Sequence, residues 1–258
     1  MKIALTIAGS DPTGGAGLQA DLRVFALFGV HGISAPTALT SQNTEGIDLI
    51  LPVEKNFLQR QLDFLLKDIR PDGLKTGMLY TAYAVEIAAD IVKEHSLPNL
   101  VVDPVTVSSS GRSLVEDGAL DLIKQKLFPA SRVITPNIYE ASLFTGMNIE
   151  AESDMKEAAR ALREMGPEVV IITGGHLDGL AVDLYYDGSD FHRLESEKIR
   201  GEYHGTGCAF SAAVAASLAL GHSPLEAARR AKEFVQAAIK KAYHPGRGMG
   251  LLNIKGAH

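Results

Sequence analysis

Apolar residues follow two alternating patterns along this chain. Short apolar runs such as residues 3–8 and 169–173 have the length and the β-branched content of buried strands. Between the runs lie longer segments in which apolar residues recur every three or four positions, as they do on the buried face of a helix. This alternation predicts a three-layer α/β/α fold, in which helices flank a largely parallel central sheet.

The predicted elements can be placed by residue number. The predicted strands cover residues 3–8, 33–39, 73–76, 99–102, 132–135 and 169–173, and the segments 181–186 and 190–195 predict a hairpin around Asp187-Gly188. The predicted helices cover residues 17–28, 55–68, 81–95, 115–126, 153–165, 208–220 and 224–241. No Pro/Gly/Ser-rich linker, long charge run or internal repeat divides the sequence. We therefore expect one domain over residues 1–258.

Composition narrows the classes of partner. The 258 residues are 46% hydrophobic, which suffices for a large core, and the formal net charge of −6 gives no general attraction to nucleic acid or anionic membranes. The single cysteine excludes an intrachain disulfide and fits a reducing compartment. The start of the chain lacks a signal-length apolar segment, and residues 209–220 are too short to span a bilayer, so we expect a cytoplasmic protein.

Glycines and candidate polar residues fall where predicted strands end. In open α/β sheets, ligands bind beyond the carboxyl ends of the strands. The loop at residues 14–17 has neither the GxGxxG spacing of dinucleotide sites nor the GK[ST] ending of a P-loop, and by itself it fits a structural turn. We expect one shared cleft formed by residues 9–17, Asp103-Pro104, Asn137 with Glu140, Gly174-Gly175 and residues 205–208.

The cysteine lies where a glycine turn meets an alanine-rich helix, in the run Gly205-Thr206-Gly207-Cys208. Free backbone N–H groups at a helix start bind phosphate, and the same field lowers the pKa of a thiol from its usual value of about 8.5. Cys208 would then be a base or a nucleophile. The alternative is a buried cysteine that packs as a small hydrophobic residue. The segment by itself fits both interpretations equally.

Asn137 and Glu140 lie on the same side of a predicted first helical turn. An amide and a carboxylate there, joined by Asp103, suit Mg²⁺ that is held through water beside nucleotide phosphates. The alternative is a helix cap at Asn137 and a helix-dipole partner at Glu140. No HExxH or comparable spacing is present, which argues against a transition-metal site, and we expect His204 to position other groups.

Several segments, taken together, resemble one family. They are residues 6–22, 37–44, 75–79 and 135–137, Gly174-Gly175-His176 and residues 204–208. Each segment alone is only suggestive. Their order and spacing resemble the hydroxymethylpyrimidine/phosphomethylpyrimidine kinases of thiamine synthesis, a branch of the ribokinase-like superfamily, almost from end to end.

The resemblance implies a ribokinase-like fold and a Mg-ATP-dependent kinase. Such enzymes phosphorylate 4-amino-5-hydroxymethyl-2-methylpyrimidine and then its monophosphate. Cys208 stands where related sugar kinases have an aspartate base, and relatives are often homodimers. The remaining implied site residues are Gln42 as a hydrogen-bond partner of the pyrimidine ring, Gly9, Ala16, Asp21, Met78 and Val105 around that ring, Asn137 and Glu140 with Mg-ATP, and Gly205, Thr206 and Gly207 as the anion hole for the transferred phosphoryl group.

Two positions depart from the family pattern. Family members commonly carry lysine before the Gly-Gly-His motif and in the loop after Asp103-Pro104, where this chain has Thr173 and Ser109. The candidates to replace the missing charges are Arg112, Lys75 and Arg247. We expect nucleotide affinity and the second phosphorylation to be weakened, because the second transition state carries more negative charge.

Two other functions stay open at this stage. A pyridoxine or pyridoxal kinase is one, because that vitamin also presents a hydroxymethyl group on a flat nitrogen ring, although Gln42-Asn43-Thr44 favours the pyrimidine. The other is a pyrimidine-binding protein with weak catalysis, which the missing lysines suggest. The intact run from Gly205 to Cys208, together with Asn137 and Glu140, argues against it.

Overall fold

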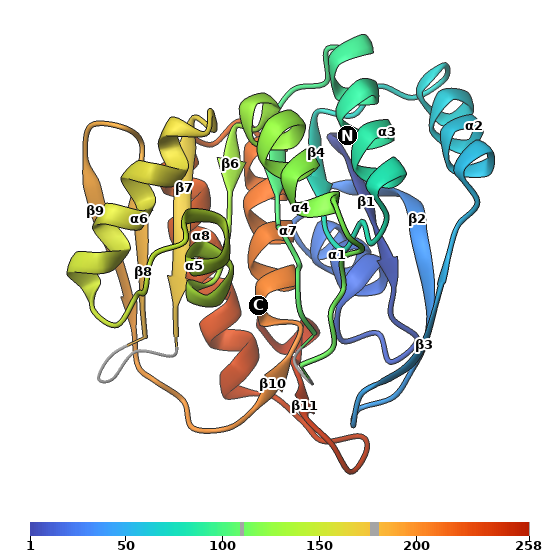
Figure 1. Cartoon of the computed structure of the whole chain (residues 1–258). Helices are drawn as coiled ribbons and strands as arrows, with labels where there is room; N and C mark the ends of the chain where they lie inside the picture. The colour runs from blue at the N-terminus through green and yellow to red at the C-terminus, as the bar shows by residue number, and fades with distance from the viewer. Residues whose placement is uncertain (109–110, 176–180, 258) are drawn as a thin grey trace.

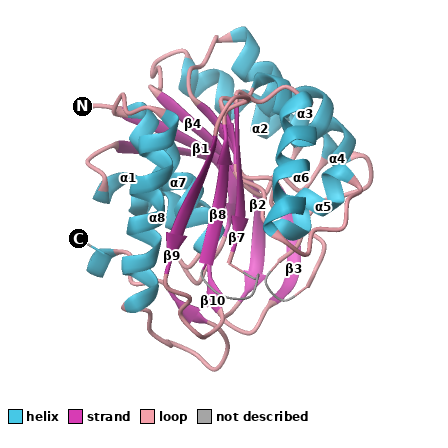
Figure 2. Ribbon diagram, turned by 90° about the vertical axis from the view of Figure 1, so that its left-hand side faces the viewer, coloured by secondary structure: helices cyan, strands magenta, loops and turns pink. Residues whose placement is uncertain are grey.

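The computed structural model of the chain describes residues 1–108, 111–175 and 181–257. Its centre is a nine-stranded sheet with the strand order β3-β2-β1-β4-β5-β6-β7-β8-β9. The inner strands run parallel, and antiparallel strands form both edges (Figure 1). Helices cover both faces of the sheet, which gives the predicted three-layer architecture (Figure 2).

The direction of the strands decides where a site can form. Because the inner strands run the same way, their carboxyl ends meet at one edge of the sheet. The parallel strands are β1 (Ile3–Ser10), β2 (His31–Gln42), β4 (Gly73–Thr76), β5 (Leu100–Val102), β6 (Val133–Ile134) and β7 (Val169–Gly174). The antiparallel strands are β3 (Ile47–Pro52), β8 (Ala181–Tyr186) and β9 (Phe191–Ser196), and β10 (Tyr203–His204) pairs with β11 (Gly250–Leu251) in a separate sheet.

Each face of the large sheet has its own group of helices and its own core. Along β1, Ala4 belongs to one core and Leu5 and Ile7 to the other, because successive side chains of a strand point to opposite faces. On one face lie α1 (Gly17–Leu27), α7 (Thr206–Ala219) and α8 (Pro224–Lys240), and on the other lie α2 (Lys55–Leu66), α3 (Ala82–Glu94), α4 (Ala119–Leu122), α5 (Ile138–Thr145) and α6 (Glu152–Glu164) (Figure 2).

Helix α7 is buried on every side over residues 209–219. A helix that is apolar all round belongs in the interior, and the small alanine side chains let the sheet and the neighbouring helices approach closely. The approach is close at β4, where a Cβ atom on Gly73 would lie 3.0 Å from the carbonyl oxygen of Ala215. This packing fixes the start of α7, and with it Cys208, at the carboxyl edge of the sheet.

The predicted elements are confirmed with a few differences. The helix predicted over residues 115–126 begins later, because Gly118 has a φ of 81° and α4 starts at Ala119; a π turn over Ile123–Leu127 continues it. Strand β3 and the β10–β11 pair were not predicted from the sequence, and the predicted strands 99–102 and 132–135 are shorter. Within the described ranges, no helix is long and apolar enough to cross a membrane.

Candidate active site

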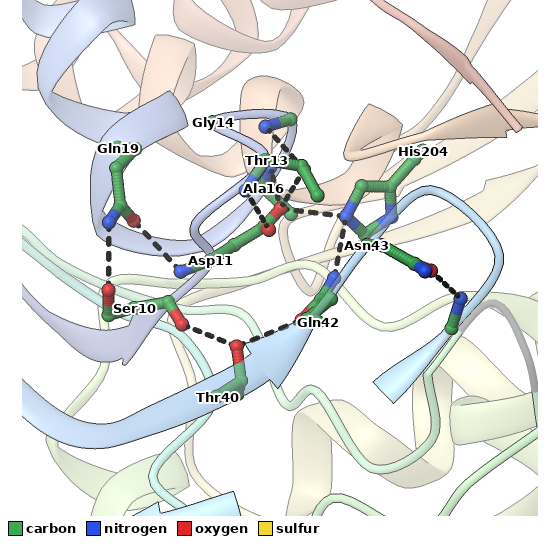
Figure 3. A network of polar contacts seen from close by, with 12 residues as sticks. Ser10, Asp11, Thr13, Gly14, Ala16, Gln19, Thr40, Gln42, Asn43 and His204 are labelled. Atoms are coloured by element: carbon green, nitrogen blue, oxygen red, sulfur yellow. Dashed lines mark hydrogen bonds and ion pairs between the residues drawn. The ribbon is translucent and has the colours of Figure 1, made fainter. Parts of the chain in front are cut away.

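Asp11 organises the glycine loop between β1 and α1 (Figure 3). Its buried carboxylate accepts hydrogen bonds from the backbone N–H and the hydroxyl of Thr13, both at 2.9 Å, and from the N–H of Ala16 at 2.8 Å. Gly17 has a φ of 58°, and a Cβ atom on it would lie 2.4 Å from the carbonyl oxygen of Gly9. The loop therefore needs glycine there, and Asp11 holds it in one conformation before any ligand binds.

The turn before α7 packs directly against this glycine loop. Gly205 has a φ of 84°, and a Cβ atom there would lie only 1.8 Å from the carbonyl oxygen of Gly15. Among the described side chains, none caps the start of α7. The first N–H groups of the helix, at Thr206, Gly207 and Cys208, therefore point out of its positive end without a side-chain acceptor, which is the geometry of an anion site.

Cys208 lies between the starts of two helices. Its half-buried side chain accepts a hydrogen bond from the backbone N–H of Gly17, the first residue of α1. The loss of solvation nevertheless raises the pKa of the thiol to about 12, and the Asp103 and Asp21 carboxylates add to the rise, while Lys75 opposes it. The prediction that this pKa is lowered is therefore wrong for the protein without ligands, because the loss of solvation outweighs the Lys75 charge and the Gly17 N–H.

A buried group of charges surrounds this cysteine. The ammonium nitrogen of Lys75 lies 2.7 Å and 2.9 Å from the two carboxylate oxygens of Asp21 and 3.9 Å from Asp103 Oδ2. Thr6 donates to Asp21 at 2.6 Å, and Ser211 donates to Asp103 at 2.8 Å. Burial alone would lower the pKa of Lys75, but Asp21, Cys208 and Asp103 raise it above its ordinary value. Lys75 therefore stays charged in the interior.

Two expectations from the sequence need correction here. The side chain of Asp21 has an exposure of 0%, so it does not line a pocket and can shape one only through Lys75 and Thr6. Lys75 is equally buried, so it does not reach out to replace the lysines missing at Thr173 and Ser109. Asp21 is a predicted pocket residue and Lys75 a predicted replacement for a missing charge, and the sequence does not reveal that the two side chains neutralise one another.

Asn137 and Glu140 form a capping box at the start of α5. Asn137 Oδ1 accepts from the N–H of Glu140 at 2.9 Å, and Glu140 Oε2 accepts from the N–H of Asn137 at 2.9 Å. The other oxygen of Glu140 accepts from the N–H of Thr106 at 3.3 Å. Burial and the nearby Asp103 carboxylate raise the pKa of Glu140 to about 8. The structural alternative is thus realised, and Asp103 and Glu140 are neighbours, as the sequence predicts.

Three threonines at the ends of central strands were not predicted as site residues. In the part of the chain that the structure describes, the buried hydroxyls of Thr76, Thr106 and Thr135 have no hydrogen-bond partner. Buried hydroxyls are normally hydrogen-bonded. These groups therefore suit bound water or a ligand at this edge of the sheet. The signal in the sequence is their position, because Thr76 and Thr135 end predicted strands and Thr106 follows another by four residues.

The residues predicted to surround an aromatic ring lie together. A Cβ atom on Gly9 would lie 2.4 Å from the methyl carbon of Met78, and Val105 packs against the apolar cluster that contains Met78. Ala16 precedes α1, and the amide of Gln42 lies 3.2 Å from His204 Nε2 (Figure 3). His204 also contacts Asp11 at 2.8 Å, so it positions other groups, as predicted.

The remaining predicted positions have clear places. The N–H of Thr173 donates to the carbonyl of Pro136 at 2.9 Å, which joins the ends of β6 and β7. Arg112 donates to the carbonyls of Ile47 and Asp48 at 2.9 Å and 2.6 Å, so it is held against β3. Arg247 is exposed. The positions 109 and 176, and with them Ser109 and the histidine of the Gly-Gly-His motif, lie outside the described residues.

Comparison with known proteins places the chain in a family. The family model described as phosphomethylpyrimidine kinase matches residues 11–253. The hydroxymethylpyrimidine/phosphomethylpyrimidine kinase of Synechococcus elongatus is 43% identical over 255 residues, which cover 98% of this chain and 97% of the relative. The chain belongs to the phosphomethylpyrimidine kinase family. The matched residues include all the motif segments from residue 11 onward.

A second relative is longer. The thiamine biosynthesis bifunctional protein ThiED of Geobacter sulfurreducens is 46% identical over 251 residues, which cover 96% of this chain and 51% of the relative. The chain thus spans about half the length of that bifunctional protein.

Solved structures of related kinases share the fold. The ADP complex of Bacillus subtilis pyridoxal kinase is 40% identical, with a TM-score of 0.92 over 99% of this chain and 98% of that chain. The phosphomethylpyrimidine kinase of Clostridium difficile 630 is 37% identical, with a TM-score of 0.83 over 93% of this chain and 100% of that chain. The fold is therefore ribokinase-like, as the sequence predicts.

Proposed function

We propose that this protein transfers a phosphoryl group from ATP to the hydroxymethyl group of 4-amino-5-hydroxymethyl-2-methylpyrimidine, and a second one to the resulting monophosphate, in thiamine biosynthesis. Membership of the phosphomethylpyrimidine kinase family supports the reaction class. The observation that carries the proposal is the uncapped start of α7, which packs against the glycine loop with Cys208 between them. The transferred phosphoryl group and the alcohol that accepts it can meet at such a place.

Most of the rate enhancement in this proposal comes from positioning and charge. In this proposal Gly205, Thr206 and Gly207 form the anion hole. The N–H groups of Thr206 and Gly207, at the uncapped start of α7, would bind the oxygens of the transferred group on a turn that is already formed. Phosphoryl transfer has a loose transition state, so the alcohol needs little activation before it attacks. The anion hole is thus the principal catalytic element.

Cys208 would accept the proton of the alcohol. With a pKa of about 12, the thiol keeps its proton in nearly all molecules at neutral pH. The thiolate that does form is stabilised by the N–H of Gly17 and by the charge of Lys75. This minor form accepts the hydroxyl proton as the oxygen bonds to phosphorus. The proposed base therefore becomes more effective as the pH rises.

The region around Asp103 and Glu140 fits an ATP-borne magnesium ion. Both carboxyl groups have raised pKa values, chiefly through burial, so a dication nearby would favour their ionised forms. Asn137 could hold it through water, beside the free hydroxyls of Thr106 and Thr135. Magnesium bound in this way neutralises phosphate charge. In this proposal the ion is held mainly through ATP.

The aromatic ring would lie beside β2. Gln42 would hydrogen-bond the ring, with Gly9, Ala16, Met78 and Val105 around it. Ile50 and Leu114, which belong to the same buried cluster as Met78, would support these contacts from behind. Asp21 acts at a distance in this proposal, by holding Lys75.

A pyridoxal kinase is the second candidate, and the likeness to the B. subtilis pyridoxal kinase favours it. The deciding assay gives purified protein Mg-ATP with the aminopyrimidine alcohol, its monophosphate or pyridoxal, and follows ADP together with the phosphorylated products. We expect both pyrimidine phosphates. Faster turnover of pyridoxal would identify the protein as a pyridoxal kinase. Tight pyrimidine binding without ADP release would instead indicate a pyrimidine-binding protein with weak catalysis.

The proposal includes a homodimer. Leu39, Leu49 and Leu51 have exposures of 49%, 59% and 59% and lie on one face of the β2–β3 ladder, in which Leu39 is paired with Leu51. An exposed apolar face at the edge of a sheet favours association with a second chain. We propose that two copies meet through this face.

A further inference from the structure

A row of polar groups connects the glycine loop to the end of β2 (Figure 3). His204 Nε2 lies 2.8 Å from Asp11 Oδ2 and 3.2 Å from one end of the Gln42 amide. The other end of that amide lies 3.1 Å from Thr40 Oγ1, and the Thr40 hydroxyl is 2.8 Å from the carbonyl oxygen of Ser10. Every member is within hydrogen-bond distance of the next, so the protons must be distributed consistently along the row.

The proton at the Thr40 end is fixed by Ser10. A carbonyl oxygen can only accept, so the single hydroxyl proton of Thr40 is donated to Ser10. Thr40 then faces Gln42 with a lone pair. The contact at 3.1 Å is a hydrogen bond only if the amide nitrogen of Gln42 lies at that end and donates to Thr40.

The proton at the other end is fixed by Asp11. Its carboxylate already accepts from the N–H and the hydroxyl of Thr13 and from the N–H of Ala16, and three donors favour the ionised form. Burial by itself would raise the pKa of Asp11, but His204 and the Thr13 donors outweigh it and hold the pKa below its ordinary value. An ionised Asp11 requires a proton on His204 Nε2. A protonated Nε2 has no lone pair, so it cannot accept from the Gln42 amide nitrogen, and only the amide oxygen can share its proton with Asp11.

Both ends of the row require the same orientation of the Gln42 amide, although the amide in Figure 3 is drawn with its nitrogen toward His204. The oxygen and nitrogen ends of a glutamine are assigned from their hydrogen bonds. We infer that Gln42 directs its oxygen to His204 and its nitrogen to Thr40, and that His204, held by Asp11, is a positioning residue that decides which edge of a ring the site accepts. This inference rests on the proposed contact between Gln42 and the substrate ring.

The fixed amide has one oxygen lone pair and one N–H left for a ligand. A 4-aminopyrimidine offers the complement, an exocyclic N–H donor beside a ring nitrogen acceptor. The corresponding 4-oxo pyrimidine offers the reverse order, a carbonyl beside a ring N–H. An amide that cannot turn therefore accepts the first and rejects the second, because the second would leave buried donors and acceptors unpaired.

The experiment compares the 4-amino and 4-oxo alcohols as substrates of the whole protein with Mg-ATP. His204→Leu and Thr40→Val each remove one of the two groups that hold the amide, and Ser41→Ala, one position along β2 from Thr40, is the matched control. We expect both test variants to lower the kcat/KM ratio of amino over oxo alcohol by about tenfold, mainly through KM, which corresponds to about 1.4 kcal/mol. The control should keep the ratio of the unaltered protein. A ratio that is the same in all four proteins would overturn the inference.

A second measurement does not depend on activity or on the stability of a variant. Long-range ¹H–¹⁵N spectra of the unaltered protein report which ring nitrogen of His204 carries a proton. We expect a protonated Nε2, and an unprotonated Nε2 would overturn the inference. If the unaltered protein phosphorylates neither pyrimidine, the proposed function fails, and the state of Nε2 still decides the arrangement of the row.

Discussion

The ammonium nitrogen of Lys75 lies 2.7 Å from Asp21 Oδ1, and neither side chain has any exposure to solvent. The pair joins β4 to α1 and lies next to Cys208 and Asp103. A lone charge in this position would be very unfavourable, so each residue depends on the other. The pair is thus at once a part of the core and the source of the positive charge near the thiol.

Lys75→Met should therefore unfold far more easily than the unaltered protein. The variant leaves the Asp21 charge buried without its partner, and we expect the free energy of unfolding to fall by about 3–5 kcal/mol in urea denaturation. Lys75→Met with Asp21→Asn should recover much of the loss. The exposed pair Lys2–Asp72, at 2.6 Å, is the control, and Lys2→Ala should change stability by no more than about 1 kcal/mol. Equal effects of the two lysine substitutions would contradict the importance of burial.

The rate should rise with pH through Cys208. Since kcat/KM reports groups of the free enzyme and the thiol has a pKa of about 12, the thiolate fraction grows about tenfold per pH unit across the neutral and mildly alkaline range. Cys208→Ala should lower kcat by about 10²–10⁴-fold and remove this slope while ATP still binds. A plateau that begins below pH 8 would show that the pKa is lowered instead.

Glu140 should make stability depend on pH. Its folded pKa of about 8 lies above the ordinary value of 4.5, so between these values the folded state binds the extra proton and stability falls as the pH rises. We expect Glu140→Gln to remove part of the decline in unfolding free energy between pH 5 and pH 8, on the order of 1–4 kcal/mol. Parallel stability curves for the two proteins would argue against a protonated Glu140.

Gly205→Ala should damage the turn more than an ordinary glycine substitution does. Gly221, with a φ of 94° and no atom within 4 Å of its added Cβ, is the matched control for backbone strain alone, while Gly205 also clashes with Gly15. We expect about 1–2 kcal/mol of destabilisation for Gly221→Ala, and about 1–3 kcal/mol more, with loss of turnover, for Gly205→Ala. Thermal unfolding and kcat would be measured for both variants. Equal losses of stability would show that the contact between Gly205 and Gly15 does not add to the backbone strain.

The proposed dimer should depend on the β2–β3 edge. Leu49→Glu and Leu51→Glu place charges on the apolar face, and sedimentation velocity should show a shift from dimer to monomer at micromolar concentration. Phe64→Glu is a suitable control, because Phe64 is 80% exposed but belongs to α2. A dimer that survives both leucine substitutions would place the interface elsewhere.

Many of the helices and strands can be predicted from local sequence patterns. The strand at residues 73–76 was predicted with the bounds of β4, and α8 was predicted within one residue, because their apolar patterns are set by nearest neighbours along the chain. The start of α4 was missed because Val115 pairs with Tyr80, a partner that no local pattern contains, and Gly118 then takes a left-handed φ before the helix begins. Strand β3 was missed because half of its side chains are exposed and two of these are leucines, so it shows no clear alternation of apolar and polar residues.

By itself the sequence determined the layers, the chemistry at the strand ends and the motifs of one kinase family. Only the tertiary structure decided the protonation and the charge of those groups. Asp21 and Lys75 are separated by 54 positions, and Asp11 and His204 by 193, yet each pair is in hydrogen-bond contact. A pKa and a proton position depend on the solvent that is excluded and the charges that are near in space. Neither can be obtained from residue order until the chain has folded.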